Sequence, residues 1–340
     1  MKWALRRCLI APLVVALAAL AWTTLPLWLV GTAALSPVVR GRLRPLRFFW
    51  VVLVYVTCEA LLLVVMFGLW IASGFGWRLR TAYFEGIHYD LVQGTMWVFF
   101  REARRVLRLS IASEGPGPAE HGGRPILVCC RHAGPGDSFV LIHTLMAWYD
   151  REPRVVLKDT LAWDPAIDVL LNRIPARFIT PNPGPTEDLE AQIAELASGL
   201  DENDAFVIFP EGGNFTPQRR QRAIDRLRRL GMERMAQRAE RMIHVLAPKP
   251  GGFLAALDAA PDADVVLVAH TGLDHMVTVG EVWRELPMDK RIVMRWWQVP
   301  RAEIPAGREA RIEWLFEWWE RIDTWIAENR PAEISTGRSA

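Results

Sequence analysis

The sequence is poor in cysteine. Its 340 residues include four, Cys8, Cys58, Cys129 and Cys130, and none of them belongs to a Cys-x-x-Cys pair. Two of the four lie within long apolar runs. A disulfide-stabilised scaffold and a cysteine-based zinc site are therefore not expected.

The sequence also lacks an excess of charge of either sign. It has 40 Lys and Arg against 38 Asp and Glu, which gives a net charge of +2. So balanced a charge does not favour nucleic acid as a partner, and we expect none. An apolar fraction of 51% excludes a chain that is disordered throughout.

Several common catalytic and nucleotide-binding motifs are absent. The sequence contains no Gly-x-x-x-x-Gly-Lys-Ser/Thr phosphate loop, and no Gly-x-Gly-x-x-Gly follows a predicted strand. It also lacks the Gly-x-Ser-x-Gly nucleophile elbow. Phosphate-loop nucleotide hydrolases, dinucleotide-binding enzymes and α/β-hydrolases of the elbow type are therefore not expected.

Charge is missing from two long segments near the N-terminus. Residues 8–39 contain no Asp, Glu, Lys or Arg, and residues 48–77 contain one charge, Glu59. A spanning helix needs about 20 apolar residues, so each run is long enough. The first run is too long for a secretory signal peptide, and the second follows it closely. We therefore expect residues 1–80 to form membrane-anchoring helices, and the 16 Trp agree with a membrane interface.

The number of membrane crossings is left open by the basic residues around these runs. Three clusters precede, separate and follow them: Lys2, Arg6 and Arg7; Arg40, Arg42, Arg44 and Arg47; Arg78 and Arg80. The positive-inside rule places all three clusters on the cytoplasmic side, which two simple spans cannot satisfy. Either the middle cluster lies outside, or one run enters the bilayer and returns on the same side.

Residues 81–123 are predicted to form an interfacial helix and a loop. Met96 and the aromatic residues Trp97, Phe99 and Phe100 precede arginines at 101–108, a pattern that suits a helix lying at the membrane surface. An ordinary helix packed on the next domain is the alternative. Glycine and proline at 114–123 then indicate a loop.

From residue 124 onward, short apolar runs alternate with longer mixed segments. The runs predict strands at 126–130, 154–157, 177–180, 205–209, 265–269 and 291–299. The mixed segments predict helices at 138–149, 165–172, 186–198, 218–241, 252–259 and 308–328. This alternation predicts an α/β domain over residues 124–330, with helices on both faces of a sheet. Residues 331–340 are expected to be a flexible tail.

Two of the predicted helices have unusual charge. Residues 218–241 contain nine arginines against three acidic residues, which suits anionic lipid or the phosphates of coenzyme A, or simply a solvated surface. Residues 308–328 have an apolar face opposite Glu313, Glu317 and Glu320. Anionic lipid repels acidic groups, so we expect this last helix to pack against the protein.

The first candidate for chemistry lies where the strand 126–130 ends. Arg131 and His132 enter a loop rich in glycine and proline, and Asp137 follows five residues after the histidine. If the loop folds back, the carboxylate orients one imidazole nitrogen and leaves the other to accept a proton. A structural histidine beside a helix-capping aspartate is the alternative explanation of this spacing.

The second candidate follows the strand 205–209. The segment Phe209-Pro210-Glu211-Gly212-Gly213 places a carboxylate and two glycines at the end of a strand, where open α/β sheets bind ligands. With His132-x-x-x-x-Asp137 upstream, it resembles the glycerolipid acyltransferase family, whose pattern is His-x-x-x-x-Asp followed by Phe-Pro-Glu-Gly-Thr-Arg. Segment 156–165 is similar to the family's Leu-Lys-x-Ser-Leu-x-Trp-x-Pro segment. Segments 214–216 and 244–253, with the arginine-rich helix between them, resemble a membrane-bound branch of that family, and the resemblance covers about 126–274.

The resemblance implies a mixed α/β sheet flanked by helices, with membrane helices before it, in a protein of the cell membrane with a cytoplasmic catalytic domain. It implies direct transfer of a fatty acyl group from acyl-CoA, or from acyl carrier protein, to a lysophospholipid hydroxyl. The default acceptor is 1-acyl-sn-glycerol-3-phosphate, which would give phosphatidic acid. No metal, further cofactor or covalent enzyme intermediate is expected.

The resemblance also implies roles for individual residues. His132 would be the general base, and Asp137 would orient it. Glu211, Gly212 and Gly213 would shape the acceptor site, and Lys158 would face lipid phosphate or coenzyme A.

The sequence departs from the family pattern at three positions. Arg131 stands where asparagine is usual, Gly213 where threonine is usual, and Asn214 where arginine is usual. That arginine is associated with the acceptor's phosphate, and asparagine supplies neither its charge nor its forked geometry. Candidate substitutes are Arg131, Arg219, Arg220 and Lys249. Otherwise the acceptor is a different lysolipid or a lipid without phosphate, or the protein binds lipid without catalysis. His143, His270 and His275 are predicted to be structural or surface residues.

Overall fold

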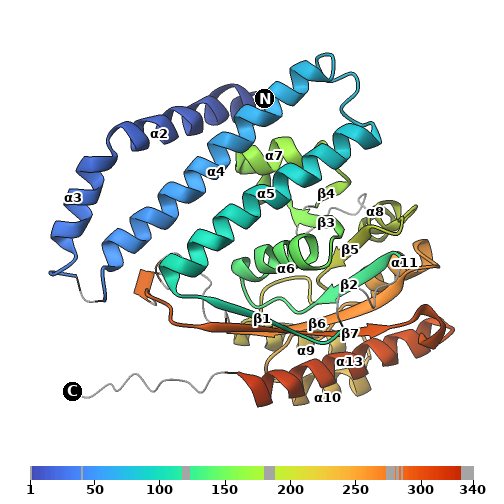
Figure 1. Cartoon of the computed structure of the whole chain (residues 1–340). Coiled ribbons are helices and arrows are strands. Elements are labelled where there is room, and N and C mark those ends of the chain that lie inside the picture. The colour runs from blue at the N-terminus through green and yellow to red at the C-terminus, as the bar shows by residue number, and fades with distance from the viewer. Residues whose placement is uncertain are drawn as a thin grey trace, which may run out of the picture.

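The computed structural model describes residues 2–39, 41–116, 123–179, 188–272, 280, 283, 284 and 286–330. Within these residues the central element is a seven-stranded sheet of order β1-β7-β6-β2-β5-β3-β4 (Figure 1). Its strands are β1 Ser110–Glu114, β2 Ile126–Cys130, β3 Glu152–Lys158, β4 Ala176–Ile179, β5 Asp204–Ile208, β6 Asp264–Thr271 and β7 Arg291–Val299. All neighbours are parallel except β6 and β7, so the sheet is mixed, as expected.

The central strands β2, β5 and β6 are apolar between their ends because both faces of the sheet are covered. In β2, Leu127 and Cys129 belong to one hydrophobic core, and Val128 and Cys130 belong to the other. The first core is completed by α8 Leu189–Ala197, α9 Pro217–Arg229, α10 Glu233–Arg241, α11 Pro250–Ala259 and α13 Arg308–Asn329. The second is completed by α5 Ala82–Leu107 and α6 Pro135–Trp148 (Figure 1).

The apolar N-terminal segment folds into helices that pack beside α5. They are α1 Lys2–Leu5, a π-helical turn Arg6–Ile10, α2 Ala11–Thr23, α3 Leu25–Leu35 and α4 Arg44–Ala72. The chain bends at Thr24, directly before Leu25-Pro26, because proline cannot continue the hydrogen bonds of α2. Helices α2 and α3 then lie along α4 as the other arm of a hairpin (Figure 1). Of the described residues, Trp3–Thr23 and Arg44–Ala72 are long and apolar enough to cross a membrane, by length and composition alone.

A short segment joins these helices to the sheet. After β3 come a 3-10 helix, Asp159–Trp163, and α7 Pro165–Leu171. Leu170 and Leu171 of α7 pack against Leu62 and Met66 of α4 in a third hydrophobic core. The N-terminal helices are therefore attached to the domain by side-chain packing as well as by the chain itself.

Three local features differ from the sequence-based expectations. Ser110–Glu114 is an edge strand, which was not predicted because one of its residues, Ile111, is buried and the rest are small or polar. The predicted helix 218–241 is two helices, α9 and α10, interrupted at Gly231, whose φ of +71° does not fit a helix. Phe100 and Leu107 of α5 are buried in the domain, which supports the packed alternative for this helix over the interfacial one. The predicted tail 331–340, His275 and most of the loop 114–123 lie outside the described residues.

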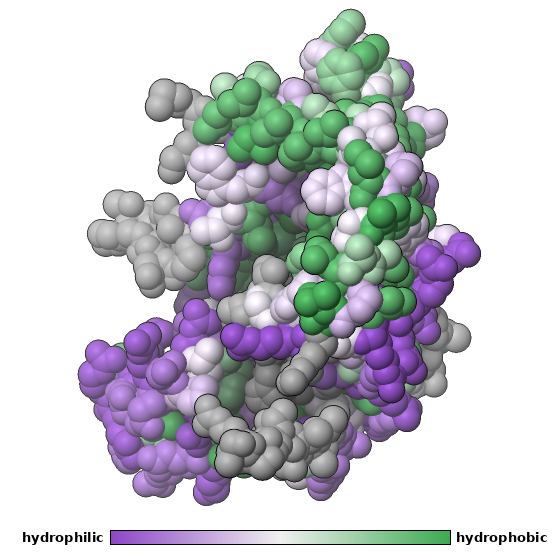
Figure 2. Space-filling model, turned by 90° about the vertical axis from the view of Figure 1, so that its left-hand side faces the viewer, coloured by the Kyte–Doolittle hydropathy of each residue, from purple (hydrophilic) through white to green (hydrophobic). Residues whose placement is uncertain are grey.

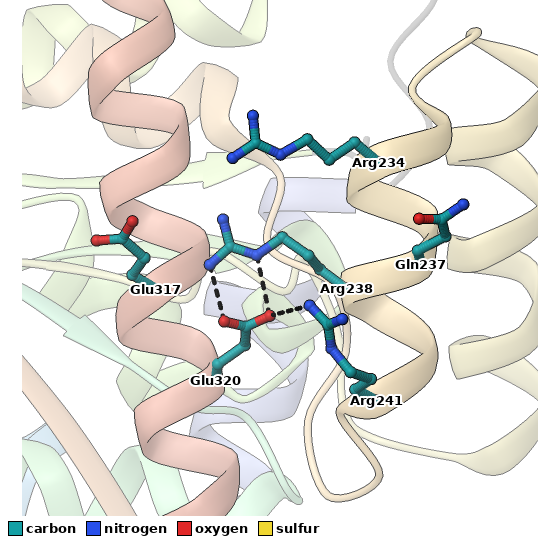
Figure 3. A pocket seen from close by; sticks show the side chains of 6 residues that line it. All are labelled: Arg234, Gln237, Arg238, Arg241, Glu317 and Glu320. Carbon is teal, nitrogen blue, oxygen red and sulfur yellow. Dashed lines mark hydrogen bonds and ion pairs between the residues drawn. The ribbon is translucent and has the colours of Figure 1, made fainter.

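Helix α13 packs against the protein, as expected from its acidic face. The guanidinium of Arg238, on α10, donates to Glu320 at 2.8 and 2.9 Å and to Glu313 at 2.8 Å. These side chains lie beside a polar pocket of about 420 Å³ between α10 and α13 (Figure 3), lined by Arg234, Gln237, Arg238, Arg241, Glu317 and Glu320. The hydrogen bond from Arg238 lowers the pKa of Glu320.

Replacing Arg238 with alanine is expected to lower the free energy of unfolding by about 2 kcal/mol, because two carboxylates lose a largely buried cationic partner. The difference from wild type shrinks as the pH falls through the carboxylate range, since a protonated Glu320 gains nothing from Arg238. Urea unfolding of the detergent-solubilised protein measures both effects. Arg234→Ala is the matched control: its side chain is 76% exposed and also pairs with Glu313, so a loss below about 0.5 kcal/mol is expected. Equal losses in the two variants would contradict this account.

Candidate active site

The candidate residues meet at one edge of the sheet because three neighbouring strands end there. Strands β6, β2 and β5 are adjacent and parallel, so their C-terminal ends lie side by side. His132 follows β2, Glu211 follows β5, and His270 is the penultimate residue of β6. This is the edge at which open α/β sheets bind ligands.

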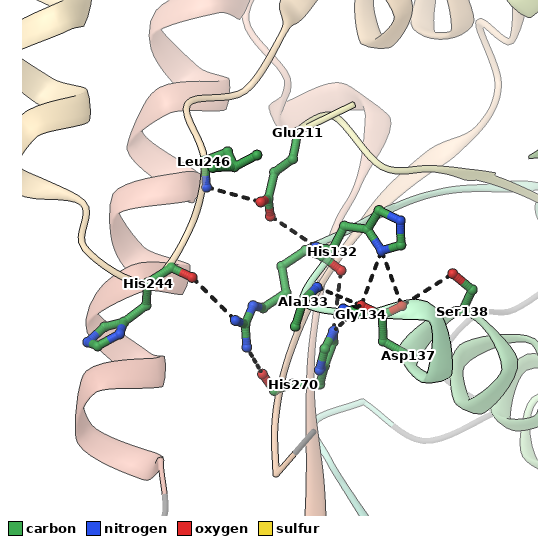
Figure 4. Close-up of polar contacts among 10 residues, drawn as sticks. His132, Ala133, Gly134, Asp137, Ser138, Glu211, His244, Leu246 and His270 are labelled. Carbon is green, nitrogen blue, oxygen red and sulfur yellow. Dashed lines mark hydrogen bonds and ion pairs between the residues drawn. The ribbon is translucent and has the colours of Figure 1, made fainter. Parts of the chain in front are cut away.

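The structure brings His132 and Asp137 into contact. Asp137 lies in the first turn of α6, and the loop before it folds back as expected. The Nδ1 atom of His132 is 3.2 Å from both carboxylate oxygens of Asp137 (Figure 4). The backbone N–H groups of Ala133 and Gly134 donate to Asp137 Oδ2 at 2.6 and 2.9 Å, and the Ser138 hydroxyl donates to Oδ1 at 3.3 Å. The aspartate therefore fixes the loop and the imidazole together.

This geometry determines which histidine nitrogen is available. Because Nδ1 faces two carboxylate oxygens, it carries the proton, and the lone pair of neutral His132 lies on Nε2. Nε2 points away from Asp137 (Figure 4), and the ring packs against Phe209 with centroids 4.5 Å apart. Burial opposes ionisation of Asp137, but hydrogen bonds from His132 and His270 outweigh it and hold the pKa of Asp137 well below its usual range. The pair thus has the protonation pattern of a general base and its orienting carboxylate.

Glu211 links two loops through hydrogen bonds to their backbones, and its buried side chain is not exposed to a ligand. Its side chain is buried, with Oε1 accepting from the backbone N–H of His132 and Oε2 from that of Leu246, each at 3.0 Å (Figure 4). Burial raises the pKa of Glu211 to about 8, against the opposing influence of Arg131 and the two N–H donors. The expected role in shaping the acceptor site is therefore indirect, through the position of His132.

Arg131 is also buried, which differs from its expected place beside lipid phosphate. Its guanidinium donates to the carbonyl oxygens of His270, at 2.7 Å, and His244, at 3.3 Å. Arg131 directly follows β2, which pairs with the buried strand β6, and its side chain reaches the backbone of the loop at His244. Arg220 is used similarly, donating to the carbonyl oxygens of Met242 and Glu240 at 2.6 Å. Neither residue is placed to replace the missing arginine of the family pattern.

The other two candidate substitutes lie beside the glycines that follow β5. A Cβ atom at Gly212 would stand 2.8 Å from the Lys249 ammonium, and one at Gly213 would stand 3.2 Å from the Arg219 guanidinium. Gly212 has a φ of +67°, which favours glycine in this turn. Partial burial of the ammonium, then the charges of Arg226 and Arg219, lower the pKa of Lys249. A basic site therefore borders the loop beyond Glu211.

Lys158 and His270 complete the comparison with the sequence analysis. Lys158 ends β3 at the same edge of the sheet, with β5 between β3 and β2, and its role toward lipid or coenzyme A stays a prediction. His270, expected to be structural, lies with its Nε2 atom 3.4 Å from Asp137 Oδ2. The signal that could have singled it out is its position at the end of the strand beside β2.

No cluster of three His, Cys, Asp or Glu side chains suited to a metal ion occurs among the described residues.

Comparison with known proteins identifies the domain that holds these residues. Residues 109–269 match the family model described as Acyltransferase. No curated protein matches the sequence. Among solved structures, the chain is similar to the 1-acyl-sn-glycerophosphate (LPA) acyltransferase PlsC from Thermotoga maritima, with 14% identity over 72% of this chain and 83% of that one and a TM-score of 0.48. The matched segment runs from the residue before β1 into β6 and includes His132, Asp137 and Glu211, so these residues lie in a domain of the acyltransferase family.

Proposed function

We propose that this protein is a membrane-bound acyltransferase that moves a fatty acyl group from acyl-CoA to the free hydroxyl of a lysophospholipid. The default acceptor is 1-acyl-sn-glycerol-3-phosphate, and the product is then phosphatidic acid. The observation that carries the proposal is the His132–Asp137 pair, whose Nε2 atom is directed away from the carboxylate. Besides capping the start of α6, the buried Asp137 carboxylate holds the imidazole in a single tautomer, which is what a general base needs.

The proposed reaction needs one proton acceptor and no covalent enzyme intermediate. His132 Nε2 accepts the proton of the acceptor hydroxyl while the hydroxyl oxygen attacks the thioester carbonyl carbon. The carbon–sulfur bond then breaks, and the imidazolium returns the proton to the departing thiolate, which leaves as the free thiol. Asp137 stabilises the imidazolium between these two steps.

Replacement of His132 by alanine is expected to abolish acyl transfer from labelled oleoyl-CoA to lysophosphatidic acid, with a loss of at least about 1,000-fold in kcat/KM. Membranes containing each variant are assayed beside membranes that lack the protein. His244→Ala is the control, since it removes an imidazole near the site but keeps the carbonyl oxygen that Arg131 uses. Product formation that survives His132→Ala would overturn the mechanism, and absence of product with wild type for every acceptor would overturn the function.

We propose that Lys249 and Arg219 hold the phosphate of the acceptor in place of the missing arginine. Both are exposed and border the glycine loop beyond Glu211, where Arg219 also donates to the carbonyl oxygen of Asn214 at 3.1 Å, whereas Arg131 is buried and Arg220 is half-buried against carbonyl oxygens. A cation pair at this place favours a phosphate-bearing acceptor over a neutral lipid.

The double change Lys249→Ala and Arg219→Ala is expected to raise KM for lysophosphatidic acid at least about tenfold, because two charged contacts to phosphate are lost. KM for oleoyl-CoA serves as the internal reference and is expected to change less. Arg229→Ala, an exposed arginine at the far end of α9, is the matched control with unchanged KM. A wild type that prefers a neutral monoacylglycerol in a lysolipid panel would refute the phosphate site.

The N-terminal hairpin is proposed to lie in the cell membrane with the catalytic domain on the cytoplasmic side. Its outer side chains are apolar and exposed, including Leu27 at 75% and Phe67 at 61%, and Figure 2 shows such residues gathered on the upper part of the molecule. So large an exposed apolar surface favours a lipid environment.

Contacts at both ends of the hairpin support entry and return on one side of the bilayer. Arg6 and Arg7 pair with Asp168 of α7 at 2.9 and 2.8 Å. Arg44, at the opposite end, donates to the carbonyl oxygen of Leu286 at 2.9 Å. In the proposed topology these two basic clusters lie on the same side of the bilayer as the catalytic domain, which agrees with the positive-inside rule.

Cysteine labelling tests this topology. In a Cys8→Ser background, Val38→Cys at the hairpin tip and Thr324→Cys on α13 are expected to react with a membrane-impermeant maleimide from the same face of sealed vesicles. Both positions are exposed, and the three other cysteines are buried. Labelling of Val38→Cys from the face opposite to Thr324→Cys would show that the first run crosses the bilayer.

A further inference from the structure

The carboxylate of Asp137 has a second histidine partner, on a different strand from His132. His270 belongs to β6, and its Nε2 atom lies 3.4 Å from Asp137 Oδ2 and 3.3 Å from the carbonyl oxygen of Arg131. The side chain is 2% exposed, so no solvent competes for these contacts. His270 therefore contacts Asp137 in the interior of the protein.

The two contacts determine which ring nitrogen of His270 carries the proton. Both partners of Nε2 are acceptors, a carboxylate and a carbonyl oxygen, so Nε2 carries a hydrogen. The oxygen that His270 meets is Oδ2, which also accepts from the backbone N–H groups of Ala133 and Gly134. Oδ2 thus has three donors besides His132, whose Nδ1 atom lies 3.2 Å from both oxygens, and Oδ1 also accepts from the Ser138 hydroxyl.

His270 is itself held in place by Arg131. The Arg131 guanidinium donates to the carbonyl oxygen of His270 at 2.7 Å, and the His270 ring lies against the carbonyl oxygen of Arg131. The backbone N–H of Arg131 also donates to Val268 at 3.2 Å, which continues the pairing of β2 with β6. The ring position of His270 is thereby tied to the register of the two central strands.

We propose that His270 is a positioning residue for acyl transfer. It holds the Asp137 carboxylate at the torsion angle at which both oxygens reach His132 Nδ1. The terminal torsion of aspartate is broad, and each donor narrows it: the Ser138 hydroxyl acts on Oδ1, and His270 acts on Oδ2 from the neighbouring strand β6. His270 touches no reacting atom and acts through Asp137 on the orientation of His132. The inference rests on the proposed function only for its kinetic consequence.

Two substitutions separate this role from simple core packing. His270→Leu keeps an apolar side chain of similar bulk but removes the N–H, and kcat is expected to fall about 10- to 100-fold with KM unchanged within about twofold. His270→Gln places an N–H near the position of Nε2 and is expected to restore most of kcat. His143→Leu is the matched control: His143 is a buried histidine on α6 that stacks on Phe100. It is expected to retain wild-type kcat.

Loss of kcat in His270→Gln as severe as in His270→Leu, with both variants folded by thermal unfolding, would overturn the proposal. So would wild-type kcat in His270→Leu. An equal loss in His143→Leu would assign the effect to packing.

A measurement without catalysis keeps the proposal testable if no acyl transfer is found in wild type. The proton on His132 Nδ1, hydrogen-bonded to Asp137, is expected to give a downfield NMR signal that disappears in His132→Gln. The proposal predicts that this signal shifts or broadens in His270→Leu and returns in His270→Gln. An unchanged signal in His270→Leu would refute the positioning role, whereas absence of acyl transfer in wild type alone would refute the proposed function.

Discussion

The structure of the site depends on one buried carboxylate. Removing the charge of Asp137 from water is costly unless donors replace its hydration, and the protein supplies them from three sources. The first is the loop that follows β2, which contributes the ring of His132 and the backbone N–H groups of Ala133 and Gly134; the second is the Ser138 hydroxyl in the first turn of α6; and the third is His270 of β6. The same interactions that offset the desolvation of the carboxylate therefore join the start of α6, the loop after β2 and the end of β6.

A second buried carboxylate extends this arrangement to β5. Glu211 accepts from the backbone of His132 on one side and of Leu246 on the other, so the loops after β2 and β5 and the segment before α11 are linked through it. His132 is thus constrained through its backbone by Glu211 and through its ring by Asp137. Beyond these contacts lie the partly exposed imidazole edge of His132 and the exposed cations Lys249 and Arg219, which is where we propose that the two substrates bind.

The sequence predicted the strands well where apolar runs are continuous. It predicted poorly those strands and side-chain positions that depend on which strands pair with each other. Residues 126–130 and 291–299 form strands at the predicted bounds because buried strands need apolar side chains throughout or in alternation. Strand β1 was not predicted because an edge strand needs little apolar surface. A single buried side chain, Ile111, does not make an alternating pattern that the sequence could reveal. The contact of His132 with Asp137 was predictable from a short loop. The placements of Arg131 and His270 were not, since both follow from the pairing of β2 with β6, which no local pattern encodes.

The measurement that tests the account most directly is the acyl-transfer rate of Asp137→Asn against wild type. Asparagine retains the size of the side chain but turns one acceptor oxygen into a donor and removes the charge that orients His132. The account predicts a fall in kcat of at least about 100-fold for acyl transfer from oleoyl-CoA, with the protein still folded and membrane-bound. A variant that keeps wild-type kcat would show that the His132–Asp137 contact is structural and would contradict the central claim.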